Sequence, residues 1–214
     1  MRFDWSDETI RAAALARPRG RDDAALFEAV RAIVDDVRTR GWAGLVEQAQ
    51  RIDERAPGRI EVAPFAAEAR ATIPAEAQDA MKLAARHIEA FHRATLPSDT
   101  EVTTFPGLNV AKQWRPIDRA GLYVPGGKAA YPSSVLMNAI PAHVAGVGEI
   151  IMVVPTPKGE KNALVLAAAY VAGVTRAFTV GGAQAVAALA YGTQTVPKVD
   201  KITGPGNAYV ASAK

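Results

Sequence analysis

The chain has 214 residues, of which 25 are basic and 22 acidic, so its formal net charge is +3 at pH 7. The basic residues are spread along the chain rather than clustered, which argues against a nucleic-acid partner. There is no cysteine, and this excludes disulfides, thiolate metal sites and a cysteine nucleophile.

The first residues are not expected to form a secretory signal. The opening stretch MRFDWSDET contains acids and lacks an apolar h-region. No run of about 18 apolar residues occurs, so no membrane span is expected. The sequence therefore predicts a cytoplasmic protein without a membrane partner.

Residues 1–96 read as amphipathic helices. Ser6 or Asp7 can cap a short first helix, a second begins near Asp22, and the longest runs from about Pro74 to Arg93. The apolar stripe of the second helix consists of Leu26, Phe27, Val30, Ile33, Val34 and Val37. The inward positions of the longest helix are Ala77, Met81, Ala84, Ile88 and Phe91. Such a helical segment has little of its own to bury these stripes, so we expect it to pack on the rest of the chain or on a second subunit.

Residues 97–214 follow a different pattern. Two extended runs around Pro106-Gly107 predict a β-hairpin. Strand-like runs then alternate with helix-like runs, the strands at 121–124, 149–154, 177–180 and 199–203. This alternation predicts an α/β fold with a Rossmann-like parallel sheet. The last helix would hold only about two turns, which is marginal alone, so we expect this domain to be truncated at residue 214.

Three glycine-containing turns, at 125–127, 181–182 and 204–206, should lie at the carboxyl edge of that sheet, where ligands of such folds bind. Helix N–H groups behind a glycine turn suit a phosphate. Tight turns with no ligand explain the glycines equally well.

Tyr123, Gln184 and Asn207 adjoin the turns. Each has an ordinary structural explanation, as a packed aromatic, a polar residue at a helix start and an N-cap, but three at one edge favour a binding site.

No catalytic or metal centre emerges from the residues. His87, His92 and His143 lack ligand spacing, and neither an HExxH nor a GxSxG pattern occurs. The acids of the N-terminal helices are interpreted as lying on solvent faces. The chain therefore reads as a binding part with no catalytic and no metal-binding residues of its own.

Four runs resemble the histidinol dehydrogenase family, in the family's order: GLYVPGG from Gly121, PSSVLM from Pro132, VGGAQA from Val180 and VPKVDKITGPGN from Val196. The resemblance implies an aldehyde-dehydrogenase-like fold, here incomplete, and a homodimer. It implies oxidation of L-histidinol to L-histidine with two NAD, and a zinc ion that positions the substrate.

The family's NAD contacts fall at the tyrosine of the PGG run, the glutamine of GGAQA and the asparagine of GPGN, which match Tyr123, Gln184 and Asn207. Its zinc ligands and its glutamate–histidine base pair lie downstream of GPGN. The resemblance therefore implies an N-terminal half that binds NAD, binds no zinc and is inactive alone. Two alternatives stay open: a stand-alone, non-catalytic nucleotide-binding or interaction module, and an α/β protein of another activity whose glycine turns hold a phosphorylated metabolite.

Overall fold

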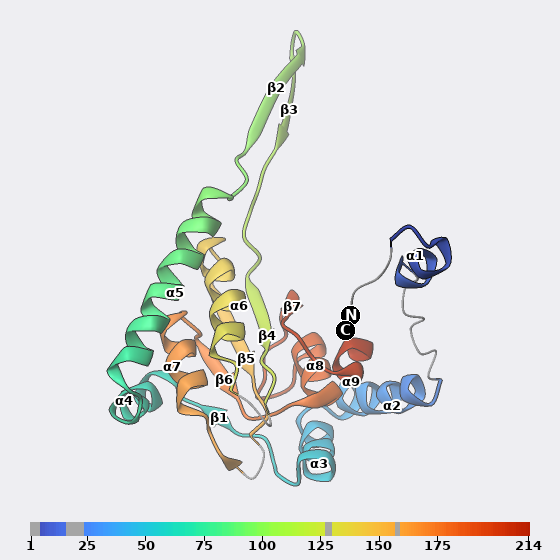
Figure 1. The fold of residues 1–214 in the computed structure, drawn as a ribbon, viewed down its shortest axis with the longest axis vertical. Coiled ribbons are helices and arrows are strands. Elements are labelled where there is room, and N and C mark those ends of the chain that lie inside the picture. The colour runs from blue at the N-terminus through green and yellow to red at the C-terminus, as the bar shows by residue number, and fades with distance from the viewer. Residues whose placement is uncertain (1–4, 16–23, 127–129, 157–158) are drawn as a thin grey trace.

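The computed structural model describes residues 5–15, 24–126, 130–156 and 159–214. Its centre is a five-stranded sheet in the order β1-β6-β5-β4-β7 (Figure 1). The strands are β1 (Arg59–Ile60), β4 (Arg119–Tyr123), β5 (Glu149–Val153), β6 (Arg176–Phe178) and β7 (Lys201–Thr203). Strands β4 to β7 are parallel, and β1 is antiparallel to β6. The predicted α/β fold with a parallel sheet is confirmed.

Helices cover both faces of the sheet because successive side chains of each strand point to opposite sides. In β5, Ile150 and Met152 face a core built with α6 (Pro132–Val144) and α7 (Ala163–Val171). Ile151 and Val153 face the other core, built with α8 (Gly182–Tyr191). Both sides of the strand are buried, which explains its continuous apolar sequence.

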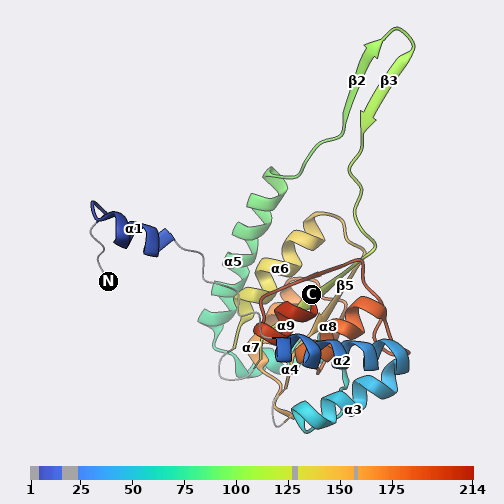
Figure 2. The ribbon, with the colours of Figure 1, turned by 90° about the vertical axis from the view of Figure 1, so that its right-hand side faces the viewer.

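The N-terminal helices that follow the first one pack on these same two cores (Figures 1 and 2). Helices α2 (Ala24–Arg40) and α3 (Trp42–Asp53) contact α8, whereas α4 (Val62–Thr72) contacts α7 and α5 (Ala75–Ala94) contacts α6. Strand β1 lies between the two helix pairs in sequence and joins the sheet at its edge. The segment thus packs on the α/β core, as expected, while the division at residues 96 and 97 stays a prediction.

The remaining N-terminal helix, α1 (Glu8–Leu15), is capped by Asp7, whose carboxylate accepts from the N–H groups of Thr9 and Ile10.

Two apolar residues were assigned to the wrong side of their helices. Phe27 and Phe91 are each 65% exposed. In α2 the buried stripe consists of Val30, Ile33 and Val37. Leu26 in the first turn packs against this stripe, whereas its neighbour Phe27 lies beside it in solvent. Phe91 lies in the last turn of α5 and contacts the ring of His92 edge-on.

The predicted hairpin forms from β2 (Thr100–Phe105) and β3 (Leu108–Lys112) and projects away from the body (Figures 1 and 2). All of its strand residues are exposed. Val102 is paired with Val110, and Phe105 with Leu108.

The chain order around β4 creates a switch point. From β4 the chain runs through β5 to β6 on one side, then returns to β7 on the other side of β4. Ligands of doubly wound sheets bind at the carboxyl ends of strands flanking such a point. The turn after β7 leads into α9 (Ala208–Ala213). Among the described residues, no helix is long and apolar enough to cross a bilayer.

Candidate functional site

The glycine turns at the carboxyl edge pack against residues at the ends of neighbouring strands. A Cβ atom on Gly181 would lie 2.6 Å from the Cβ of Pro155, and one on Gly126 would overlap the carbonyl oxygen of the same proline. A Cβ on Gly204 would overlap the carbonyl oxygen of Tyr123. Contacts within the chain therefore suffice to require glycine at these positions, and the glycines alone do not indicate a ligand.

Tyr123 ends β4 and is 6% exposed. Its phenolic oxygen accepts a hydrogen bond of 3.0 Å from the backbone N–H of Gly182. Burial raises the pKa of the phenol. On its other side, the ammonium group of Lys214 lies 5.9 Å from the ring centroid and donates to the carbonyl of Gly204. Tyr123 therefore holds the start of α8 against the sheet.

Gln184 lies in the first turn of α8 and is fully buried. Its Nε2 donates to Oδ2 of Asp53 at 3.3 Å. Its Oε1 is buried and has no hydrogen-bond partner among the described residues. A buried amide oxygen without a partner is costly, so this atom is the clearest indication of a ligand contact at the edge.

Asp53 was missed by the sequence analysis. It is the last residue of α3, and its carboxylate accepts hydrogen bonds from the Gly181 backbone N–H and the Gln184 amide. Burial raises the pKa of this carboxyl group. The interpretation of all acids in the N-terminal helices as solvent-facing is therefore wrong here. The available signal was its place at a helix C-terminus, where the helix dipole disfavours an acid unless another group stabilises it.

Asn207 caps α9: its Oδ1 accepts from the backbone N–H of Val210 at 3.1 Å. The expected N-cap is thus present. The side-chain Nδ2 has no partner among the residues that the structure describes, and the residue is exposed. One end of this amide is structural and the other is available to a ligand.

A cavity of about 530 Å³ brings two of the three predicted residues together. We call it the α8–α9 pocket. Its lining consists of Ala29, Ala32 and Ile33 from α2, Arg51 and Ile52 from α3, Gly182, Ala183 and Gln184 from α8, and Asn207 and Tyr209. Its volume lies within the range of small-molecule sites. Tyr123 does not line it, but bonds to Gly182, which does.

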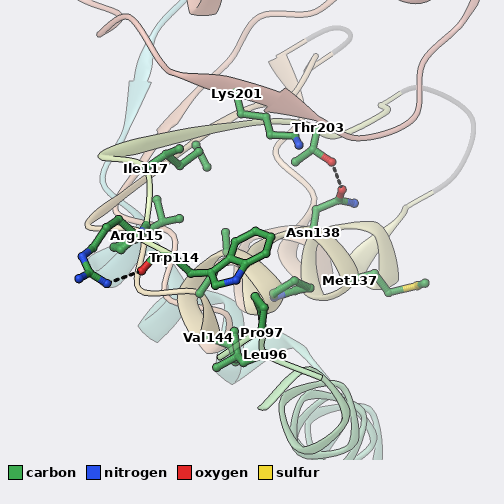
Figure 3. Close-up of a pocket in the computed structure, with 16 residues that line it drawn as sticks. Leu96, Pro97, Trp114, Arg115, Ile117, Met137, Asn138, Val144, Lys201 and Thr203 are labelled. Atoms are coloured by element: carbon green, nitrogen blue, oxygen red, sulfur yellow. Dashed lines mark hydrogen bonds between the residues drawn. The ribbon is translucent and has the colours of Figure 1, made fainter. Parts of the chain in front are cut away.

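A second cavity, of about 560 Å³, lies between β4, β7, α6 and the segments that lead to and from the hairpin (Figure 3). Its walls are mainly apolar, with Trp114, Met137 and Leu96 among them. Its polar lining includes Arg115, Lys201 and the hydrogen bond of 2.6 Å from Thr203 Oγ1 to Asn138 Oδ1. None of the three predicted site residues lines it.

Within residues 5–15, 24–126, 130–156 and 159–214, no three histidine, aspartate or glutamate side chains come together as a metal ion would need. The described residues therefore do not fit a zinc ion.

The fold and the carboxyl edge of its sheet together define a doubly wound α/β protein with a pocket beside the glycine-rich turns. The model of the family described as histidinol dehydrogenase matches residues 16–214. Histidinol dehydrogenase of Chromobacterium violaceum is 57% identical over 196 residues, which are 90% of this chain and 45% of the relative. That of Neisseria meningitidis serogroup A is 58% identical over 186 residues, 85% of this chain and 43% of the relative.

The fold agrees with these sequence matches. The crystal structure of histidinol dehydrogenase from Elizabethkingia anophelis superposes with a TM-score of 0.89 at 31% identity, over 97% of this chain and 48% of that one. The chain belongs to the histidinol dehydrogenase family, a family of oxidoreductases of histidine biosynthesis. It spans about half the length of the relatives it matches.

Proposed function

We propose that this chain is the N-terminal, NAD-binding part of a histidinol dehydrogenase, the enzyme that oxidises L-histidinol to L-histidine. The observation that carries the proposal is the meeting of Gln184 and Asn207, from two separate glycine turns, in the α8–α9 pocket. Both match NAD-contacting positions implied by the family resemblance. When bound, NAD would supply the hydride acceptor.

The residues of the pocket suit part of a dinucleotide. Gln184 Oε1 is an acceptor without a partner among the described residues, and Asn207 Nδ2 is available as a donor. Arg51 brings a positive charge and Tyr209 a half-exposed ring. Tyr123, the third implied contact, supports the pocket through Gly182 rather than lining it. Its proposed role is to fix the first residue of α8.

The full reaction needs groups that we propose lie in the part of the family's enzymes that this chain does not span. These are the zinc ligands, the base and the contacts to L-histidinol. We accordingly expect this chain alone to be inactive and to bind no zinc. A homodimer in the cytoplasm is the proposed setting.

The alternative in which the glycine turns cradle a phosphorylated metabolite has less support. The Gly181 N–H, at the start of α8, donates to the Asp53 carboxylate, and that of Gly182 donates to Tyr123. A phosphate there would compete with a negative charge that the protein already supplies.

The test is calorimetric titration of NAD into the 214-residue chain. Gln184→Ala and Asn207→Ser should each weaken binding about fivefold, the effect of losing one hydrogen bond. Serine keeps the cap of α9 and removes only the amide donor. Asn162→Ser is the matched control, because Asn162 caps α7 away from the pocket in the same way. Unchanged affinity in both pocket variants, or equal losses in the control, would refute the assignment.

A further inference from the structure

We propose that Asp53 is a positioning residue that sets the hydrogen-bond polarity of the α8–α9 pocket. By accepting the amide NH2 of Gln184, it fixes Gln184 Oε1 as an acceptor for the ligand. The ligand must then present an N–H or O–H group at this point, not a phosphate. The inference rests on the proposed NAD site and specifies which chemical group meets Gln184.

The geometry leaves the Gln184 side chain little freedom. It is fully buried, and its Nε2 lies 3.3 Å from Asp53 Oδ2. Its Oε1 folds back over the start of α8, where a Cβ on Gly182 would overlap it. Gly182 also has a φ of +69°, which favours glycine. The amide is thus held between the carboxylate and the backbone of the first helical turn.

The charge of Asp53 decides which end of the amide faces it. An ionised carboxylate can only accept hydrogen bonds, so the amide nitrogen must point toward it and the oxygen away. The same carboxylate accepts from the Gly181 N–H at the start of α8, which is where a phosphate would otherwise be favoured. The ligand groups that satisfy Gln184 are therefore a carboxamide NH2, an exocyclic amine or a ribose hydroxyl.

Protonation of Asp53 would reverse this polarity. The protonated carboxyl group can donate to Gln184 Oε1, and the amide then presents its NH2 group to the pocket. Helix α8 carries no charged residue toward Asp53. The ionisable neighbour of Asp53 is the phenol of Tyr123 on β4, with Lys214 beyond the phenol and Arg51 in the lining of the same pocket. Burial raises the pKa of the phenol, so Tyr123 stays neutral below about pH 7.

The first experiment needs no ligand. In the 15N-labelled 214-residue chain, the side-chain NH2 signals of Gln184 are assigned by their loss in Gln184→Glu. We expect them to shift with pH in a single step whose midpoint lies above the usual aspartate value of about 4, because burial raises the pKa of Asp53. The step should vanish in Asp53→Asn. Signals that do not respond between pH 3 and 7 would overturn the proposal.

A matched pair elsewhere in the chain provides the control. Gln48 Nε2 donates to Asp36 Oδ2 at 2.7 Å, and this hydrogen bond lowers the pKa of Asp36. Neither residue lines the pocket, although Gln48 Oε1 accepts from Arg51, which does. The Gln48 NH2 signals should therefore titrate below the usual aspartate value. Asp36→Asn should abolish that step and leave the Gln184 signals as they are. If Asp36→Asn moved the Gln184 midpoint, the response would not be local to Asp53.

The second experiment measures NAD affinity at pH 7.5 and 5.0. Asp53→Asn should weaken binding about fivefold at pH 7.5 and reduce its pH dependence, whereas Asp36→Asn should do neither. Inorganic pyrophosphate, which lacks the carboxamide, amine and ribose hydroxyl groups of NAD, should leave the Gln184 signals in place. Equal NAD affinity and equal pH dependence in wild type and Asp53→Asn would overturn the role of Asp53 and leave the NAD site standing. No NAD binding in any variant would refute the proposed function, and the ligand-free titration would still decide the role of Asp53.

Discussion

The phenolic oxygen of Tyr123 accepts a hydrogen bond of 3.0 Å from the backbone N–H of Gly182, which joins the end of β4 to the first residue of α8. An N–H in the first turn of a helix has no partner within the helix. Since Gly182 is partly buried, the tyrosine hydroxyl satisfies a donor that would otherwise be left unpaired within the chain.

Tyr123→Phe should therefore lower the free energy of unfolding by about 1–3 kcal/mol, the cost of an unsatisfied buried donor. Urea denaturation measures the loss. Tyr131→Phe is the control, because that residue is 41% exposed and should change stability by less than about 0.5 kcal/mol. Equal stabilities of the two variants would contradict a structural role for the Tyr123 hydroxyl.

Gly204→Ala should destabilise the protein much more than Gly107→Ala. Both glycines have positive φ, +112° and +88°. A Cβ at 204 would overlap the carbonyl oxygen of Tyr123, whereas nothing lies within 4 Å of one at 107. We expect a loss of about 1 kcal/mol at 107, from the backbone alone, and of about 3 kcal/mol or more at 204. Similar denaturation midpoints for the two variants would be inconsistent with the packed turn.

The unfolding free energy of Asp53→Asn relative to wild type should depend on pH in a defined direction. Burial raises the folded-state pKa of Asp53, so the folded protein binds more protons than the unfolded chain between the two pKa values. The contribution of Asp53 to the unfolding free energy is then largest below its unfolded-state pKa, near 4, and falls as pH rises through its folded-state pKa. Between these two pKa values, the unfolding free energy of Asp53→Asn should rise relative to that of wild type as pH rises. Urea denaturation at a series of pH values measures this difference.

Asp36→Asn should show the opposite trend. The hydrogen bond from Gln48, with Arg40 beside it, lowers the folded-state pKa of Asp36. The stability that Asp36 contributes is then present above the unfolded pKa and is lost as pH falls through the folded one. The variant should be less stable than wild type at pH 7, by about 0.5–1.5 kcal/mol, and should approach it at about pH 3. A constant difference would refute the ionic origin of the effect.

The hairpin should tolerate polar substitutions in the isolated chain. Val102 and Leu108 are 51% and 53% exposed on strands that project from the body (Figure 2). The double variant Val102→Thr, Leu108→Thr should change the unfolding free energy by less than about 0.5 kcal/mol. Val135→Thr, at a fully buried position on α6, should cost at least about 1 kcal/mol because it buries a hydroxyl. A large loss in the hairpin variant would show that its apolar side is covered in solution.

The sequence placed the sheet and the hairpin because their signals are local. Alternating strands and helices, glycine turns and the Asn207 cap are each visible within a few residues. The Asp53–Gln184 contact is not, because it joins residues 131 apart. Nothing near Asp53 in the sequence states that the end of α3 meets the start of α8. The exposure of Phe27 was hidden for a similar reason, since α2 is covered by α8, which lies far along the chain.

The edge pairing of β1 with β6 also has a consequence for synthesis. Gly58 and Thr179, which bond beside this pairing, are 121 residues apart. At about 5–20 residues per second, β1 leaves the ribosome roughly 6–24 s before β6. During that interval the apolar side of α2 has no α8 to cover it, because α8 follows β6. The earliest part of the chain is thus the part most in need of a chaperone.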